Sequence, residues 1–455
     1  MQFTGLLLPG TFGAFALRVG RKLTVRGDAA NQGFPNVKLF SRFVMHGVSG
    51  RIALKGAADI GGKAVTLVIT AIAARTLVAD AFGVMALAMA TGWLLGVATD
   101  AGLSMHLARE SARRNDRQLL IEVLRLRAGM AYLAATMIAF VTPAMVPPHW
   151  KMQFVLVVFA QLTSAIVETI AHFFRGIQRS EFESAIHAAQ RFTTLALSLI
   201  VLTWWPRLDF LGAAMLIPAL LAMLVSCVVA WRLSLPGSGD SVITPSRFVR
   251  DILPLGAAVL ISALYFRIDV YFIERWQGLE TVGGYNAVFR LVEAMRLIPA
   301  AVMAVTFPML VQSTDTRLVQ RIGGALGGVG FALAPIGVLG SSFIVTLVYG
   351  TPYLYTAPTF AMLSLALPLF FLNYALTHQV IGWDGQRAYL LICVLALVAN
   401  IAANVALVPS LGMFGAAIAT LLTEVVVTAG CAFTLVLHGS ATRRFNTSVQ
   451  PEGSS

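Results

Sequence analysis

Twelve long apolar stretches fill residues 56–437, and they constrain the fold of this chain more than any other feature of its sequence. Each is close to the roughly 20 residues that an α-helix needs to cross a ~30 Å hydrocarbon core. They are continuously apolar, whereas the strands of a membrane β-barrel alternate in hydrophobicity. We therefore predict an all-α polytopic membrane protein. The predicted spans are 56–77, 82–100, 127–147, 152–174, 186–204, 210–231, 252–273, 285–310, 322–349, 354–377, 388–408 and 412–437.

The basic residues predict how these spans are oriented. With the N-terminus in the cytoplasm, 24 of the 33 Lys and Arg residues, Arg127 and Arg175 among them, fall on the cytoplasmic side. Cytoplasmic segments of membrane proteins carry such an excess. We therefore predict that both termini are cytoplasmic. The net charge of +12 follows from this topology, so it does not indicate a nucleic-acid partner.

Turn-forming residues divide the chain into two halves with six spans each. The stretch Leu233–Ser241 is rich in Gly, Ser and Pro and interrupts the helical pattern. We predict an N-lobe at 51–232, a cytoplasmic linker at 233–250, a C-lobe at 251–438 and a disordered cytoplasmic tail at 439–455. Residues 1–50 form a cytoplasmic tail; alternatively, Met45 is the true start and residues 1–44 are not translated.

The two halves echo each other weakly. Residues 75–84, which join the first two spans, align with residues 275–285, which join the seventh and eighth. In both segments a basic residue ends one helix and glycine opens the next. An offset of about 200 residues gives both repeats the same orientation, which predicts two lobes around a central substrate cavity.

Eight charged residues lie at apparent membrane depth, where a charge is costly and usually functional. Arg290, Glu293 and Arg296 cluster on one helix face about 120° wide. Two guanidinium groups facing one carboxylate leave a positive charge, and arginine is the preferred partner of phosphate. Structural pairing between helices is the alternative. The predicted substrate-binding residues are Arg267, Asp269, Arg290, Glu293, Arg296 and Lys63.

Other embedded carboxylates are candidates for binding a coupling proton or sodium ion: Asp59, Glu168 and Glu424. Asp59 with Lys63, and Glu168 with His172, are four residues apart and share a helix face. Each pair can instead simply neutralise its own charge. No catalytic triad, metal-ligand cluster or phosphate-binding loop is evident, so we predict a protein that is not an enzyme and needs no cofactor or metal.

Several motifs resemble those of one family, the Wzx-type oligosaccharide flippases within the multidrug/oligosaccharidyl-lipid/polysaccharide exporter superfamily. The most specific match lies near the end, where an asparagine, an L-x-P stop, a glycine turn and a glutamate follow one another. The matching residues are Arg75–Leu77, Phe82–Val84, Asp100–Ser104, Phe174–Arg179, Tyr265–Asp269, Gly284–Ala287, Phe307–Pro308, Asn404, Leu407–Pro409, Gly412–Ala417, Ala419–Thr420 and Glu424.

The resemblance implies a flippase that moves undecaprenyl-diphosphate-linked oligosaccharide from the cytoplasmic to the periplasmic leaflet for surface polysaccharide synthesis. It also implies membrane lipids, a polysaccharide polymerase and glycosyltransferases as partners. The nearest alternative is a drug/cation antiporter of the toxin-extrusion branch, whose cavity should be net acidic. A major-facilitator carrier and a membrane glycan polymerase or ligase are further alternatives, and the absence of a long outside loop disfavours the last.

Overall fold

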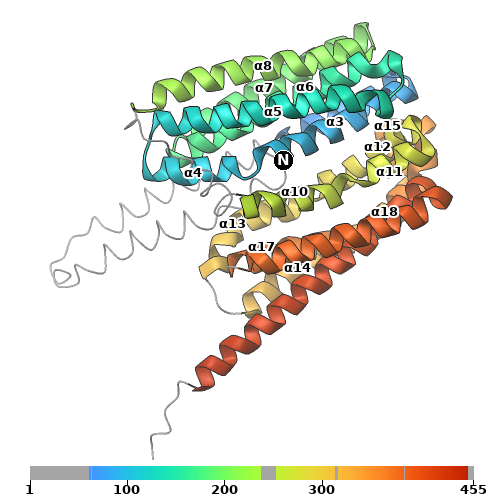
Figure 1. The fold of residues 1–455 in the computed structure, drawn as a ribbon. Helices are drawn as coiled ribbons and strands as arrows, with labels where there is room; N and C mark the ends of the chain where they lie inside the picture. The colour runs from blue at the N-terminus through green and yellow to red at the C-terminus, as the bar shows by residue number, and fades with distance from the viewer. Residues whose placement is uncertain (1–60, 63, 237–252, 313–315, 384, 449–455) are drawn as a thin grey trace, which may run out of the picture. The chain divides into compact units, whose positions relative to one another are not determined.

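The computed structural model describes residues 61–62, 64–236, 253–312, 316–383 and 385–448 (Figure 1). Over these residues the chain is almost entirely helical and contains no β-strand. The predicted all-α fold is therefore confirmed. Among the described residues, eight helices are long and apolar enough to cross a membrane, or nine if the bent pair Thr351–Leu365 and Leu367–Gly382 counts as one span.

The other predicted spans are also helical where the structure describes them. The described part of the first includes the helix Ala64–Thr76. The eighth is broken at Arg296 into α12 (Leu279–Met295) and α13 (Leu297–Gln312). The eleventh and twelfth lie within α18 (Gln386–Ser448).

Helix α18 changes direction at Gly412, whose φ of +56° is in the region that favours glycine. Gln277, the last residue of α11 (Asp269–Gln277), packs against Gly412 and donates its Nε2–H to the carbonyl oxygen of Val408 at 3.4 Å. This contact fixes the bend between the two spans. The helix continues to Ser448, whereas the sequence predicted a disordered tail from residue 439.

The described chain packs as two units. The first unit comprises the chain up to Leu260 together with Gly278–Ala294, so α12 belongs to it although the sequence assigned this segment to the second lobe. Its helices are Ala64–Thr76, α3 (Ala79–Asp100), α4 (Leu103–Arg113), α5 (Arg117–Met145), η1 (Pro148–Trp150), α6 (Lys151–Gly176), α7 (Ser180–Trp204), α8 (Leu208–Leu233), the start of α10 (Leu253–Arg267), and α12.

Helix α6 is the centre of the first unit and contacts α3, α4, α5, α7 and α8. Figure 1 shows α5 to α8 running side by side. Buried Leu107 of α4, Val123 of α5 and Phe173 of α6 form part of one apolar cluster. These contacts hold the amphipathic helix α4 against the spans around it.

The second unit comprises Ile261–Gln277 and the chain from Met295 onward. In it, α17 packs on α13, α14 and α18, while α11 lies against α18. Figure 1 shows α14, α17 and α18 side by side. Its helices are the end of α10, α11, α13, α14 (Thr316–Leu339), α15 (Ser341–Tyr349), η3 (Thr351–Thr356), α16 (Ala357–Leu365), α17 (Leu367–Gly382) and α18.

Two glycines that the predicted repeat makes equivalent, Gly83 of α3 and Gly283 of α12, pack against each other within the first unit. A Cβ added at Gly83 would lie 1.9 Å from the carbonyl oxygen of Leu279. One added at Gly283 would lie 2.9 Å from Phe82 Cδ1 and 3.4 Å from Gly83 Cα.

We expect Gly83→Ala to loosen the α3–α12 contact. The new methyl group must displace backbone rather than a flexible side chain, and such overpacking costs about 1–3 kcal/mol or more. The melting temperature of the purified protein should therefore fall by several degrees. The control is Gly129→Ala at an exposed position of α5, where a Cβ would meet nothing within 4 Å. This substitution should stabilise the helix slightly, because alanine has a higher helix propensity than glycine. Equal melting temperatures for the two variants would contradict the tight contact.

Candidate substrate and ion sites

Arg296 lies at the break between α12 and α13 and is surrounded by aromatic rings of the second unit. Its guanidinium carbon is 4.4 Å from the ring centroid of Phe370, 4.6 Å from that of Phe266 and 5.6 Å from that of Tyr374. Rings at these distances stabilise a cation. Its Nε and Nη1 are buried and form no hydrogen bond with any described residue. Arg296 is therefore a positive group that keeps unused donors.

Asp269 opens α11 and is bound by side chains from α18 that lie more than 130 positions further along the chain. Asn404 donates its Nδ2–H to one carboxylate oxygen at 2.8 Å, and Thr420 donates its hydroxyl to the other at 3.0 Å. Asn404 also bonds the backbone and side-chain oxygens of Asn400, at 2.9 and 3.0 Å. The Oδ1 of Asn404 is buried and accepts nothing.

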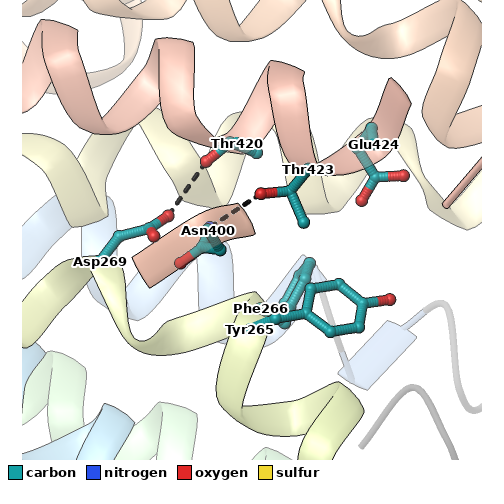
Figure 2. Close-up of a pocket in the computed structure, with 7 residues that line it drawn as sticks. All are labelled: Tyr265, Phe266, Asp269, Asn400, Thr420, Thr423 and Glu424. Atoms are coloured by element: carbon teal, nitrogen blue, oxygen red, sulfur yellow. Dashed lines mark hydrogen bonds between the residues drawn. The ribbon is translucent and has the colours of Figure 1, made fainter. Parts of the chain in front are cut away.

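Figure 2 shows that Asp269, Asn400 and Thr420 line a pocket together with Glu424. Its lining combines carboxylate, amide and hydroxyl oxygens with two aromatic rings. Oxygen ligands of this kind suit a hard cation rather than a transition metal. Within the described residues, no group of three or more His, Cys, Asp or Glu side chains could hold a metal ion. The lining residues are Tyr265, Phe266, Asp269, Asn400, Thr420, Thr423 and Glu424.

Glu424 is held from the neighbouring helix α17. Asn373 donates its Nδ2–H to the Glu424 carboxylate at 2.7 Å, and Thr428 donates its hydroxyl to Asn373 Oδ1 at 2.8 Å. The carboxylate also interacts electrostatically with Arg296. A candidate anion-binding group and a candidate ion-binding carboxylate are thus neighbours in one unit.

The other predicted substrate residues are distributed between the units. Arg267 is buried in the second unit, with its guanidinium carbon 5.5 Å from the ring centroid of Phe266. Arg290 and Glu293 lie in the first unit, where they pair at 2.8 Å. The helix break at Arg296 therefore divides the three residues of the predicted single face. Asp59 and Lys63 lie outside the described residues.

Glu168 belongs to a buried ionic network between α6 and α7. Its carboxylate accepts a hydrogen bond from Arg175 at 2.8 Å, and Arg175 also binds Glu183. His172 lies against Glu168, as the i, i+4 spacing predicted, and His187 approaches the carboxylate at 3.4 Å. Because Arg175 bridges two acidic groups, the network has a clear structural role in joining α6 to α7.

We expect Arg175→Met to destabilise the protein strongly. Removing one member of a buried ion pair leaves an uncompensated charge and costs about 3–5 kcal/mol. The control is Arg113→Ala, which removes an exposed pair with Glu110 worth about 0–1 kcal/mol. Thermal unfolding of both purified variants measures the difference, and a similar small loss in both would refute the structural role.

Two of the arginines predicted on the cytoplasmic side are drawn into the helix packing. Arg127 is only 2% exposed, and the Arg175 side chain is 12% exposed. Arg127 donates to Thr99 Oγ1 at 2.7 Å and to the carbonyl oxygen of Gly96 at 2.8 Å, so it ties α5 to α3. A count of basic residues could not separate these from exposed arginines, because each of them has a partner on another helix.

Solved structures with the same fold are transporters. An inward-facing multidrug resistance MATE family transporter of the MOP superfamily shares 14% identity, with a TM-score of 0.62 over 84% of this chain and 96% of that one. A MOP superfamily transporter from Pyrococcus furiosus shares 15% identity, with a TM-score of 0.62 over 86% and 96%. The lipid II flippase MurJ, in an inward closed conformation, shares 11% identity, with a TM-score of 0.60 over 87% and 93%.

Fold and embedded charges together define a multi-pass membrane protein with the architecture of MOP superfamily transporters. Residues 52–314, more than half of the chain, match the family of polysaccharide biosynthesis proteins, and the chain belongs to this family. Among curated protein sequences, none matches it. The resemblance seen in the sequence motifs is thereby confirmed.

Proposed function

We propose that this protein is a flippase for lipid-linked oligosaccharide in the inner membrane of a bacterium. Its substrate would be an undecaprenyl-diphosphate-linked repeat unit, turned from the cytoplasmic to the periplasmic leaflet for surface polysaccharide synthesis. The family to which the chain belongs and its structural likeness to a lipid II flippase support this substrate class.

The observation that carries the proposal is Arg296. A guanidinium at membrane depth with unbonded N–H groups is costly unless an anion uses them. The fork geometry of arginine matches the paired oxygens of a phosphate. The aromatic rings of Phe266 and Phe370 hold the side chain while leaving its donors available for a diphosphate.

The Asp269 cluster would supply the driving force. A sodium ion or proton bound among Asp269, Asn404 and Thr420 would bias the packing of α11 against α18. A ligand shifts a conformational equilibrium only by its differential affinity for the two states. Binding at this helix contact therefore couples an ion gradient to rocking of the lobes. Polymerase and glycosyltransferases would act beside the flippase.

Reconstituted vesicles test the proposal. An undecaprenyl-diphosphate-linked oligosaccharide with a dithionite-sensitive fluorophore on the glycan is placed in both leaflets of proteoliposomes. Dithionite destroys only outward-facing fluorophores, so an active flippase should expose the inner pool as well. The protected fluorescence of protein-free vesicles is the reference. Equal protection with and without the protein would refute the proposal.

Export of organic cations is the second candidate, because several structural neighbours are multidrug transporters and because Asp269 and Glu424 line one pocket. This alternative predicts that the protein lowers ethidium accumulation in cells without altering surface polysaccharide. The flippase proposal predicts that the protein leaves ethidium accumulation unchanged and that its loss reduces surface polysaccharide.

A further inference from the structure

Asn286 of α12 is an anomaly in the first unit. Its side chain is only 1% exposed, yet neither Nδ2 nor Oδ1 has a hydrogen-bond partner in the part of the chain that the structure describes. Buried amides are almost always bonded, and each exception needs an explanation. An unsatisfied amide costs free energy comparable to a lost hydrogen bond.

The position of Asn286 links it to a predicted binding group. Asn286, Arg290 and Glu293 are spaced i, i+4 and i+7 and follow one face of α12. Arg290 pairs with Glu293, but its Nε is buried and forms no hydrogen bond. One stripe of α12 thus carries two side chains with unused hydrogen-bonding atoms.

The same helix meets α3 close to Asn286. Gly283 lies one turn before Asn286 and packs against Gly83 of α3, with the ring of Phe82 beside it. Opening of α3 from α12 at this point would part the two glycines and move that ring.

The chemistry of the amide selects its ligand. Asparagine offers two donors and an acceptor. A phosphate presents only acceptors and would leave Oδ1 unpaired. A sugar hydroxyl presents both a donor and an acceptor and would satisfy both amide atoms.

We propose that Asn286 is a substrate-specificity residue that hydrogen-bonds the first sugar of the lipid-linked substrate once the α3–α12 contact opens. This inference rests on the proposed flippase function, with Arg290 as the neighbouring diphosphate contact. Asn286 then distinguishes a sugar-bearing lipid from the bare lipid diphosphate.

Two probes separate sugar binding by Asn286 from diphosphate binding by Arg290. We would measure how tightly the full-length protein in nanodiscs binds undecaprenyl diphosphate, and how tightly it binds undecaprenyl diphosphate that carries one glucose. The wild type should bind the glucose-bearing probe more tightly. Asn286→Leu keeps the branching of the side chain but removes its polar atoms, and it should weaken only that probe, by roughly 5- to 150-fold for two lost hydrogen bonds. Arg290→Ala should weaken both probes.

Thermal unfolding supplies a second readout. Replacing an unsatisfied amide with an apolar group should leave the melting temperature of Asn286→Leu unchanged or raise it. If the larger side chain disturbs folding, Asn286→Ala replaces it in the binding assay. A wild type without preference for the glucose-bearing probe, or an Asn286 variant that keeps the preference, would overturn the inference alone. A wild type that binds neither probe would overturn the proposed function as well.

Discussion

Replacing Arg296 with Ala is expected to abolish transport of the lipid-linked glycan while the protein still folds and reaches the membrane. Loss of a buried, charge-assisted contact to an anion costs about 2–5 kcal/mol. At 1.4 kcal/mol per tenfold, this is a loss of about 30- to 4,000-fold in affinity for the diphosphate. Arg296→Lys should be intermediate, because lysine keeps the charge and loses the bidentate fork. Surface polysaccharide in cells and dithionite protection in vesicles measure the effect.

The control for Arg296 is another arginine stacked on a ring. Arg207 is exposed, lies 5.4 Å from the ring centroid of Phe210 and pairs with Asp209. Arg207→Ala removes a similar cation–π contact at the surface, where it contributes little, and should transport normally. Arg296→Ala shares the loss of ring stacking, so gel filtration and melting temperature must show that it remains folded. Normal transport by folded Arg296→Ala would exclude this residue from the site.

The sequence predicted the spans well because their signal is local. A run of apolar residues of membrane length is sufficient to specify a helix there, whatever it packs against. The breaks were not predictable in the same way. Arg296 interrupts a stretch that is apolar on both sides, and its ring partners Phe370 and Tyr374 come from α17. Tertiary packing, rather than local propensity, determines where such a helix divides.

The candidate ion site also depends on contacts that the sequence does not reveal. The charge of Asp269 marks it as a candidate, and Asn404 and Thr420 belong to a sequence motif, but their spacing does not indicate that they bind Asp269. Nothing in the sequence indicates a role for Asn400, Thr423 or Asn373. Neutral amides and hydroxyls are inexpensive in a membrane helix, so they produce no signal in a hydropathy profile.

Asp269→Asn is expected to have the second largest effect on transport. The substitution preserves the shape of the side chain but removes the charge that a cation would neutralise in the pocket that Asp269 lines with Thr420 and Glu424. We expect transport in vesicles to stop.

We also expect wild-type protein to melt at a higher temperature in sodium chloride than in choline chloride, since a ligand at 100 times its Kd stabilises by about 2.7 kcal/mol. Asp269→Asn should lose this sodium-dependent increment.

Asp209→Asn is the matched control, because Asp209 lies outside the pocket, at the exposed start of α8, and pairs only with Arg207 at the surface. It should retain both transport and the sodium effect. A wild type whose stability and transport respond to pH but not to sodium would identify the proton as the coupling ion at the same carboxylate. Folded Asp269→Asn that transports at the wild-type rate would instead show that Asp269 only joins α11 to α18, because a coupling carboxylate cannot lose its charge without uncoupling transport from the gradient.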